Sequence, residues 1–283
     1  MNSRTISNIE TASLEKVGAF RIRRALPTQR LNQVDPFIFI DYLFPTEVKS
    51  GDPLRIPPHP HAGFDVVTYL LEGEFFHRDS KGHDQIARSG DLNWMSSGSG
   101  IIHSEGPTDE FLKRGGNLSL MQVWINLPAS QKFILPTFRH FDSASLPVVD
   151  NGDTWLKILV GEYGSRQSPV LPHTEIFYFH LKLKKGKLFR HLVASDHSCA
   201  AFLMNGKIQV MNEEVRSGQL VNFNADGELL DFTAAEDAEL ILFGGIPIRE
   251  KVVSYGPFVM NSFEEIQQAI ADYESGKMGS LDY

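Results

Sequence analysis

Short apolar runs separated by turn residues recur along most of the chain. Residues 17–41 alternate apolar and polar or basic positions, which is typical of strands with one face in water. Three further apolar runs end at glycine, serine or proline turn signals: residues 66–71, 86–87 and 118–127. Because these segments lack helical periodicity, the pattern predicts an all-β barrel or sandwich.

The end of the chain has a different period. Ser262 and Glu265 have the spacing of a capping box, which marks the start of a helix. Apolar residues then follow at helical spacing until Gly276: Phe263, Ile266, Ile270 and Tyr273. We therefore expect a short C-terminal helix that buries this apolar stripe against its own domain.

Two short segments occur twice. Residues 70–73 (Leu-Leu-Glu-Gly) resemble residues 203–206 (Leu-Met-Asn-Gly), 133 positions later, and residues 89–92 resemble residues 217–220, 128 positions later. Two matches in the same order at similar offsets indicate an internal repeat. The serine, proline, asparagine and glycine residues of segment 141–153 are typical of a linker. The sequence thus predicts an N-terminal domain over residues 1–140 and a C-terminal domain over residues 150–283.

Two pairs of metal-ligand residues lie in the N-terminal copy. His59 and His61 are two residues apart, as are His103 and Glu105, so each pair shares one face of an extended strand. If the pairs face each other across a barrel, three imidazoles and one carboxylate converge, a ligand set that suits iron, manganese, nickel, copper or zinc. A single His-x-His would be weak evidence, because such pairs are often surface or core residues.

The second copy lacks these pairs. The two offsets carry the four ligand positions to Leu192, Ala194, Asp231 and Thr233. His191 and His197 lie nearby but six residues apart, and we interpret them as structural or surface histidines. We therefore expect one transition metal per chain, held in the N-terminal domain only.

The ligand region resembles the cupins, and more closely the pirins. Cupins have His-x-His followed by a glutamate four residues on, where this chain has Asp65, whereas pirins take their carboxylate from Gly-x-Gly-Ile-x-His-x-Glu, here residues 98–105. Other stretches resemble pirin signatures along almost the whole chain: residues 23–27, 34–37, 68–73, 90–95 and 255–261. The resemblance implies two tandem cupin β-barrels, a bicupin, with metal ligands in the first. We assign Asp65 the role of orienting an imidazole beside the metal.

Composition excludes some functions. With 27 basic and 35 acidic residues the net charge is −8, which argues against direct nucleic-acid binding. The single cysteine, Cys199, cannot form an internal disulfide, and we expect it to be a buried apolar residue. Since no signal segment or membrane-spanning run is visible, we expect a soluble, cytoplasmic protein.

Four protein ligands would leave two positions open on an octahedral ion, which suits a chelating substrate or a substrate oxygen plus dioxygen. A closed structural zinc site is the alternative. Phe64, Trp94 and Met95 are candidates for an apolar wall, although ordinary core packing is the favoured explanation for any one of them. Gly98 and Gly100 would let the backbone pass close to the site.

The pirin resemblance implies two functions. One is a quercetin 2,3-dioxygenase that opens the central ring of a flavonol with O₂; the other is a metal- or redox-dependent protein that binds transcription regulators or metabolic enzymes. We favour the dioxygenase, with iron(II) as the ion and nickel, copper, manganese, cobalt or zinc as alternatives. Glu105 would be both a ligand and the base that takes the substrate proton.

Overall fold

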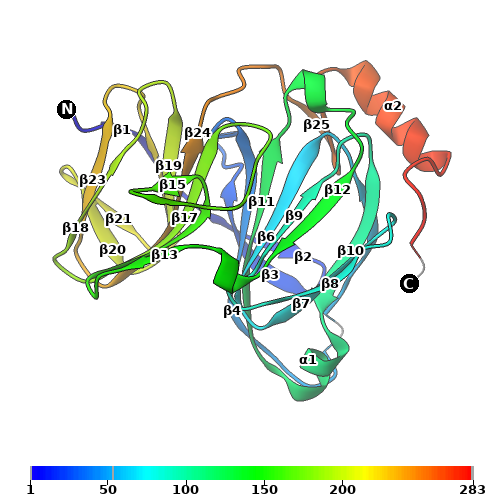
Figure 1. Ribbon diagram of the computed structural model, residues 1–283, viewed down its shortest axis with the longest axis horizontal. Helices are drawn as coiled ribbons and strands as arrows, with labels where there is room; N and C mark the ends of the chain where they lie inside the picture. The colour runs from blue at the N-terminus through cyan, green and yellow to red at the C-terminus, as the bar shows by residue number, and fades with distance from the viewer. Residues whose placement is uncertain (1, 53, 282–283) are drawn as a thin grey trace. The chain divides into compact units, whose positions relative to one another are not determined.

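The computed structural model describes residues 2–52 and 54–281, which fold into two compact units. The unit that contains the predicted ligands, called the first barrel below, comprises Leu14–Ile22, Phe39–Ser143 and Arg249–Tyr283. The other, called the second barrel, comprises Met1–Ser13, Arg23–Ile38 and Ala144–Ile248. Both are built from antiparallel sheets, as the alternation of apolar and polar residues predicts (Figure 1).

The first barrel contains two sheets. The larger has the order β12-β9-β6-β11-β4-β3-β2 and the smaller the order β5-β10-β7-β8. The strands of the larger sheet are β2 (Ser13–Val17), β3 (Phe20–Leu26), β4 (Phe37–Val48), β6 (Phe64–Glu72), β9 (Leu92–Ser96), β11 (Gly116–Asn126) and β12 (Thr137–Phe141), of which residues 13, 23–26 and 37–38 are grouped with the second barrel. Those of the smaller sheet are β5 (Ile56–His61), β7 (Glu74–Asp79), β8 (Asp84–Arg88) and β10 (Ile101–Pro107). The hairpin of β25 (Val253–Tyr255) and β26 (Phe258–Met260) and the helices α1 (Asp109–Arg114) and α2 (Phe263–Glu274) complete it.

The second barrel repeats this plan. Its larger sheet has the order β1-β22-β19-β24-β17-β14-β13 and its smaller sheet the order β18-β23-β20-β21. The strands of the larger sheet are β1 (Ile6–Thr11), β13 (Val148–Asp150), β14 (Thr154–Val160), β17 (Ile176–Leu183), β19 (Ser198–Asn205), β22 (Gln219–Phe223) and β24 (Ala238–Gly245). Those of the smaller sheet are β18 (Leu188–Leu192), β20 (Lys207–Val210), β21 (Glu213–Arg216) and β23 (Leu229–Ala234). β15 (Glu162–Tyr163) and β16 (Arg166–Gln167) form a short hairpin. The 3₁₀ turn η1 (Ala129–Gln131) lies in the first barrel, and η2 (Ser143–Ser145) spans the point in the sequence where the first barrel gives way to the second.

The repeated segments occupy equivalent places. Residues 70–73 end β6 in the first barrel, and residues 203–206 end β19 in the second. Gly73 and Gly206 both have positive φ, and a Cβ on Gly206 would lie only 2.0 Å from a backbone oxygen. The repeated segment therefore marks a turn at which only glycine fits, because a side chain would meet strain and a neighbouring backbone atom.

The terminal segments differ from the predicted boundaries, which placed residues 1–140 in one domain and 150–283 in the other. Strand β1 pairs with β22, so the first residues complete a sheet of the second barrel. Residues 249–283 belong to the first barrel, where Val259 donates a backbone hydrogen bond to Ala62. Each terminal segment covers a strand edge that would otherwise leave backbone groups unpaired.

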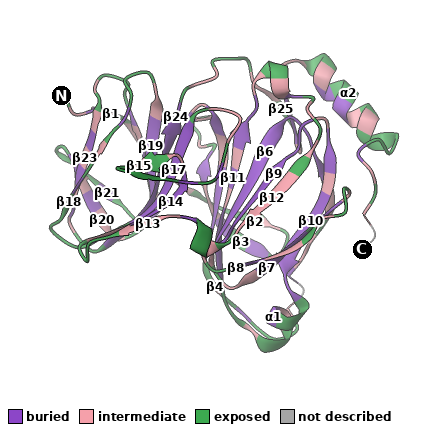
Figure 2. Cartoon of the chain, viewed as in Figure 1, coloured by how far each residue is buried: buried purple, intermediate pink, exposed green. Residues whose placement is uncertain are grey.

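Helix α2 begins and ends where the sequence predicts. Ser262 caps it, with both bonds of the capping box to Glu265 present, and Gly276 follows its C-cap with positive φ. The buried face differs in part: Ile266 and Ala269 are buried, whereas Phe263 is 64% and Tyr273 41% exposed. Figure 2 shows buried, intermediate and exposed stretches along α2. The helix thus packs through a narrower stripe than expected, against Phe258 and Met260 of β26.

Neither α-helix among the described residues has the length and apolar character needed to cross a bilayer. Cys199 is buried and unpaired, as predicted, and burial raises the pKa of its thiol.

Candidate metal centre

Three of the four predicted ligands converge. β5 and β10 are antiparallel neighbours, and their register places His103 directly opposite His59. The candidate ligand nitrogens of His59, His61 and His103 all lie within 4.8 Å of one another. His61 and His103 are almost fully buried, at 3% and 1% exposure, while His59 is partly exposed. Strand alternation and register together therefore assemble a three-imidazole cluster that is open on the side of His59.

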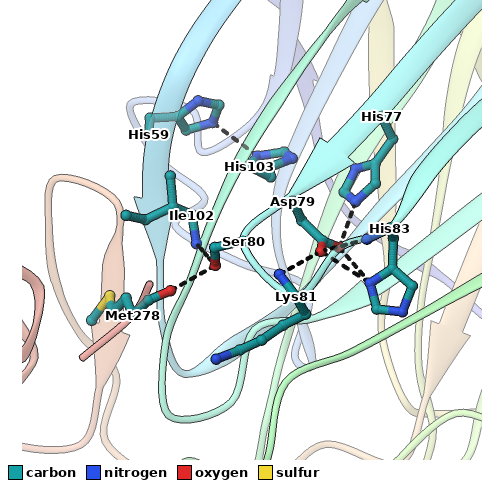
Figure 3. Close-up of polar contacts among 9 residues, drawn as sticks. All are labelled: His59, His77, Asp79, Ser80, Lys81, His83, Ile102, His103 and Met278. Atoms are coloured by element: carbon teal, nitrogen blue, oxygen red, sulfur yellow. Dashed lines mark hydrogen bonds and ion pairs between the residues drawn. The ribbon is translucent and has the colours of Figure 1, made fainter. Parts of the chain in front are cut away.

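Hydrogen bonds on the far side of the rings orient two of these imidazoles. The Nδ1 atom of His59 lies 2.9 Å from the carbonyl oxygen of Pro57, and that of His61 lies 3.3 Å from that of Pro257. A carbonyl only accepts, so each Nδ1 is the protonated nitrogen and each Nε2 has a free lone pair. The Nε2 atoms of His59 and His103 are 2.9 Å apart (Figure 3). Such an arrangement fits a cation bound by lone pairs, with outer carbonyls that fix the tautomers.

Burial keeps the cluster neutral. Desolvation lowers the pKa of His59, lowers that of His61 to about 3, and lowers that of His103 well below its usual range. The neighbouring imidazoles lower the pKa values of His61 and His103 further. Neutral imidazole is the form that binds metal, so a divalent ion need not displace a proton at neutral pH.

Glu105, the fourth predicted ligand, is not among the three described residues whose ligand atoms all lie within 4.8 Å of one another. It is buried on β10, where Gln122 of β11 donates to its Oε1 and Thr68 of β6 forms a second hydrogen bond. Desolvation nevertheless raises the pKa of its carboxyl to about 7. The β5–β10 register shifts between His103 and Glu105 because β5 has one extra residue there, whereas β10 pairs with β7 without a shift, so the alternation along β10 that predicts a common face is kept. Its assignment as the fourth ligand stays a prediction.

A second polar cluster adjoins His103. Asp79 accepts hydrogen bonds from His77 Nε2, at 3.0 Å, and from His83 Nδ1, at 2.9 Å (Figure 3). The ring of His77 is centred 5.4 Å from that of His103 and stacks on Phe138 at 4.1 Å. Neither His77 nor His83 has a second histidine two residues away in the sequence, and the signal that could have found them is the His-x-Asp spacing of His77 and Asp79.

The aromatic residues near the cluster differ from the predicted wall. Phe64 lies against His61, with ring centroids 5.2 Å apart, and Trp124 of β11 lies at 5.1 Å. Trp94 and Met95 are buried, as the core-packing alternative expects. Trp124 was missed because its place opposite Val66 depends on the pairing of β6 with β11.

The two glycines before His103 do not serve the site directly. A Cβ on Gly98 would lie 2.1 Å from the backbone oxygen of Ile134, and one on Gly100 would lie 2.6 Å from the Met278 side chain. They therefore make room for neighbouring segments of the first barrel. Asp65 is buried. Burial lowers the pKa of Lys132 to about 8, and the negative charge of Asp65 is one of the charges that oppose this shift.

Family models and known proteins match this architecture. Residues 19–125 match the model described as pirin, and residues 178–279 match the one described as the pirin C-terminal cupin domain. A Pseudomonas aeruginosa protein named as a candidate quercetin 2,3-dioxygenase is 36% identical over 262 residues, covering 91% of this chain and 92% of that protein. Pirin from Homo sapiens is 32% identical over 281 residues, covering 97% of this chain and 93% of that protein. The crystal structure of quercetin 2,3-dioxygenase from Acinetobacter baumannii superposes with a TM-score of 0.94 at 27% identity, covering 99% of this chain and 100% of that one.

Proposed function

Because the chain belongs to the pirin family, we propose that it is a metal-dependent dioxygenase that opens the central ring of a flavonol such as quercetin and releases carbon monoxide. The observation that carries this proposal is the convergence of three neutral imidazoles on one point that is open beside His59. The names of two similar proteins, from Pseudomonas aeruginosa and Acinetobacter baumannii, support the reaction class.

The residues fit a divalent transition metal. His59, His61 and His103 would hold it through their Nε2 atoms, with Glu105 as a fourth ligand and iron(II) as the preferred ion. When bound, the metal would supply a positive charge that lowers the pKa of a substrate hydroxyl and a redox-active centre for O₂. Three imidazoles and one carboxylate leave open positions on an octahedral ion, which a closed structural site would not have.

The chain's own residues would handle the substrate proton. Glu105 is buried with a carboxyl pKa of about 7, which suits a group that takes a proton from a phenol near neutral pH. Gln122 and Thr68 hold the carboxylate from the β6–β11 side. Phe64 and Trp124 pack beside His61 and keep water away from the imidazoles.

Oxygen uptake tests this proposal. Protein loaded with iron(II), and in parallel with nickel, copper, manganese, cobalt or zinc, is mixed with quercetin while O₂, carbon monoxide and flavonol absorbance are followed. We expect equal amounts of O₂ consumed and carbon monoxide released. If no metal form consumes O₂, and anaerobic protein shows no spectral change with quercetin, the dioxygenase assignment is wrong.

One observation favours the alternative, a redox-dependent protein that binds regulators or metabolic enzymes. The hollow beside Glu105, lined also by Gln122, Phe75 and Leu120, has a volume of only about 40 Å³. Ligand pockets usually measure about 300–1,000 Å³, so a flavonol would have to approach from the side of His59. Binding of a protein partner that changes with the oxidation state of iron, without O₂ uptake on quercetin, would favour this alternative.

A further inference from the structure

The second barrel contains a cavity of about 810 Å³. It opens between the hairpin β15–β16, the start of β17, and β18 with the loop that follows it. Its volume lies within the range of about 300–1,000 Å³ that is common for small-molecule sites. The cavity is independent of the proposed dioxygenase site, because all its lining residues belong to the second barrel.

Aromatic rings form much of one wall. The imidazole of His191 on β18 stacks on Tyr163 of the hairpin, with centroids 5.6 Å apart and planes at 29°. Phe177 of β17 meets the same imidazole edge-on at 5.4 Å. Tyr163, Phe177 and His191 all line the cavity, so it presents ring faces and edges to whatever enters.

Two imidazoles in the lining have unused hydrogen-bonding capacity. Burial lowers the pKa of His191 to about 4, so its ring is neutral, and none of the residues in 2–52 and 54–281 hydrogen-bonds it. The Nε2 atom of His197 is buried without a hydrogen bond and lies 3.7 Å from Glu175 Oε1. For His197 the missing partner is unfavourable, because buried polar atoms normally have one. A ligand hydroxyl in the cavity would provide one.

The charges around the cavity do not favour a strongly charged ligand. Arg190 contributes one positive charge, and Glu162 and Glu175 contribute two negative charges. With aromatic walls, unpaired imidazoles and charges of both signs, we propose that the cavity binds an uncharged phenolic aromatic molecule whose hydroxyl hydrogen-bonds to His191 or His197.

A pair of probes that differ in one hydroxyl tests this proposal. Full-length protein with His61→Ala and His103→Ala, which disable the candidate metal centre, is titrated with 2-naphthol and with naphthalene, using probe fluorescence. We expect saturable binding of one 2-naphthol per chain and binding of naphthalene that is about fivefold weaker, as one lost hydrogen bond implies. Absence of saturable 2-naphthol binding, or equal affinity for both probes, would overturn the proposal.

Variants in the second barrel locate the site. His191→Ala removes a ring of the wall and a hydrogen-bond partner, so it should weaken 2-naphthol binding about fivefold more than it weakens naphthalene binding. Leu188→Ala, on the same strand but outside the lining, is the matched control and should change neither affinity. Circular dichroism checks folding; if His191→Ala is unfolded, Tyr163→Ala on the hairpin must weaken both probes. Unchanged affinities in the folded His191 and Tyr163 variants would place the bound naphthol elsewhere.

Discussion

The two barrels share one strand order but differ at the positions of the predicted ligands. In the smaller sheets, the cross-strand pair His103–His59 of β10 and β5 corresponds to Leu230–His191 of β23 and β18. Pairing of β10 with β7 and of β23 with β20 gives the same correspondence. The residues of the second barrel that correspond to His59, His61, His103 and Glu105 are, in that order, His191, Val193, Leu230 and Phe232.

This difference distinguishes the residues that the fold requires from those that the candidate metal centre requires. Val193, Leu230 and Phe232 are buried in the apolar core of the second barrel, where Phe232 lies 5.2 Å from Phe189. The same backbone therefore accepts either a polar cluster or apolar packing at these positions. Three positions distinguish the candidate metal centre of the first barrel from the apolar core of the second, and the predictions below exchange or remove the side chains at these positions.

The largest effect is expected from His61→Ala combined with His103→Ala. Removing two of the three converging imidazoles should abolish metal binding and turnover together, because one imidazole and one carboxylate bind a divalent ion only weakly. Metal analysis of purified protein and oxygen uptake measure both effects. His191→Ala in the second barrel is the control, and full metal content in the double variant would refute the site.

Next in size is Glu105→Gln, which keeps the shape of the side chain but removes its charge. We expect this variant to retain part of its metal while turnover of quercetin falls by about 10²-fold or more, the usual contribution of a general base. Glu239→Gln is a matched control, since Glu239 accepts a hydrogen bond from His180 in the second barrel. Turnover at the parent rate with metal bound would assign the proton to another group, with Asp65 the next candidate.

A gain of binding is predicted for Val193→His combined with Leu230→His. Together with His191 these would place three imidazoles at the positions that correspond to His59, His61 and His103. Burying two imidazoles should lower the free energy of unfolding by roughly 2–4 kcal/mol without metal, and bound metal should restore part of it. A second equivalent of cobalt or zinc by metal analysis is the expected result; a stable variant with one equivalent would show that the cluster needs more than these positions.

The sequence predicted the elements better than the register between them. Turn residues and alternation indicated the strands and the repeat, and a capping box with helical spacing located helix α2, because these signals are local. The repeat offsets carried the ligand positions to Leu192 and Asp231, each one residue from the structural counterparts His191 and Leu230. Since side chains alternate at every residue, this single step moved the comparison to the opposite face and hid His191 as the counterpart of His59.

Contacts between distant strands were also hidden from the sequence. His77 and Trp124 adjoin the cluster only because β7 pairs with β10 and β11 pairs with β6. Likewise, nothing local in the first residues indicates that β1 pairs with β22. The exchange of terminal segments could therefore be found only from the assembled sheets.

The smallest predicted effect tests whether the C-terminal segment belongs to the first barrel. Ser262→Ala removes the side chain that accepts from the Glu265 amide and breaks the capping box of α2. Loss of an N-cap lowers the free energy of unfolding by about 1 kcal/mol. Because residues 249–283 belong to the first barrel, amide hydrogen exchange should accelerate in α2 and β26 and stay unchanged in β19 and β24 of the second barrel. Ser217→Ala, which removes a hydrogen bond to Met204 in the second barrel, is the reciprocal control. Faster exchange in β19 and β24 on Ser262→Ala would mean that the C-terminal segment stabilises the other unit instead.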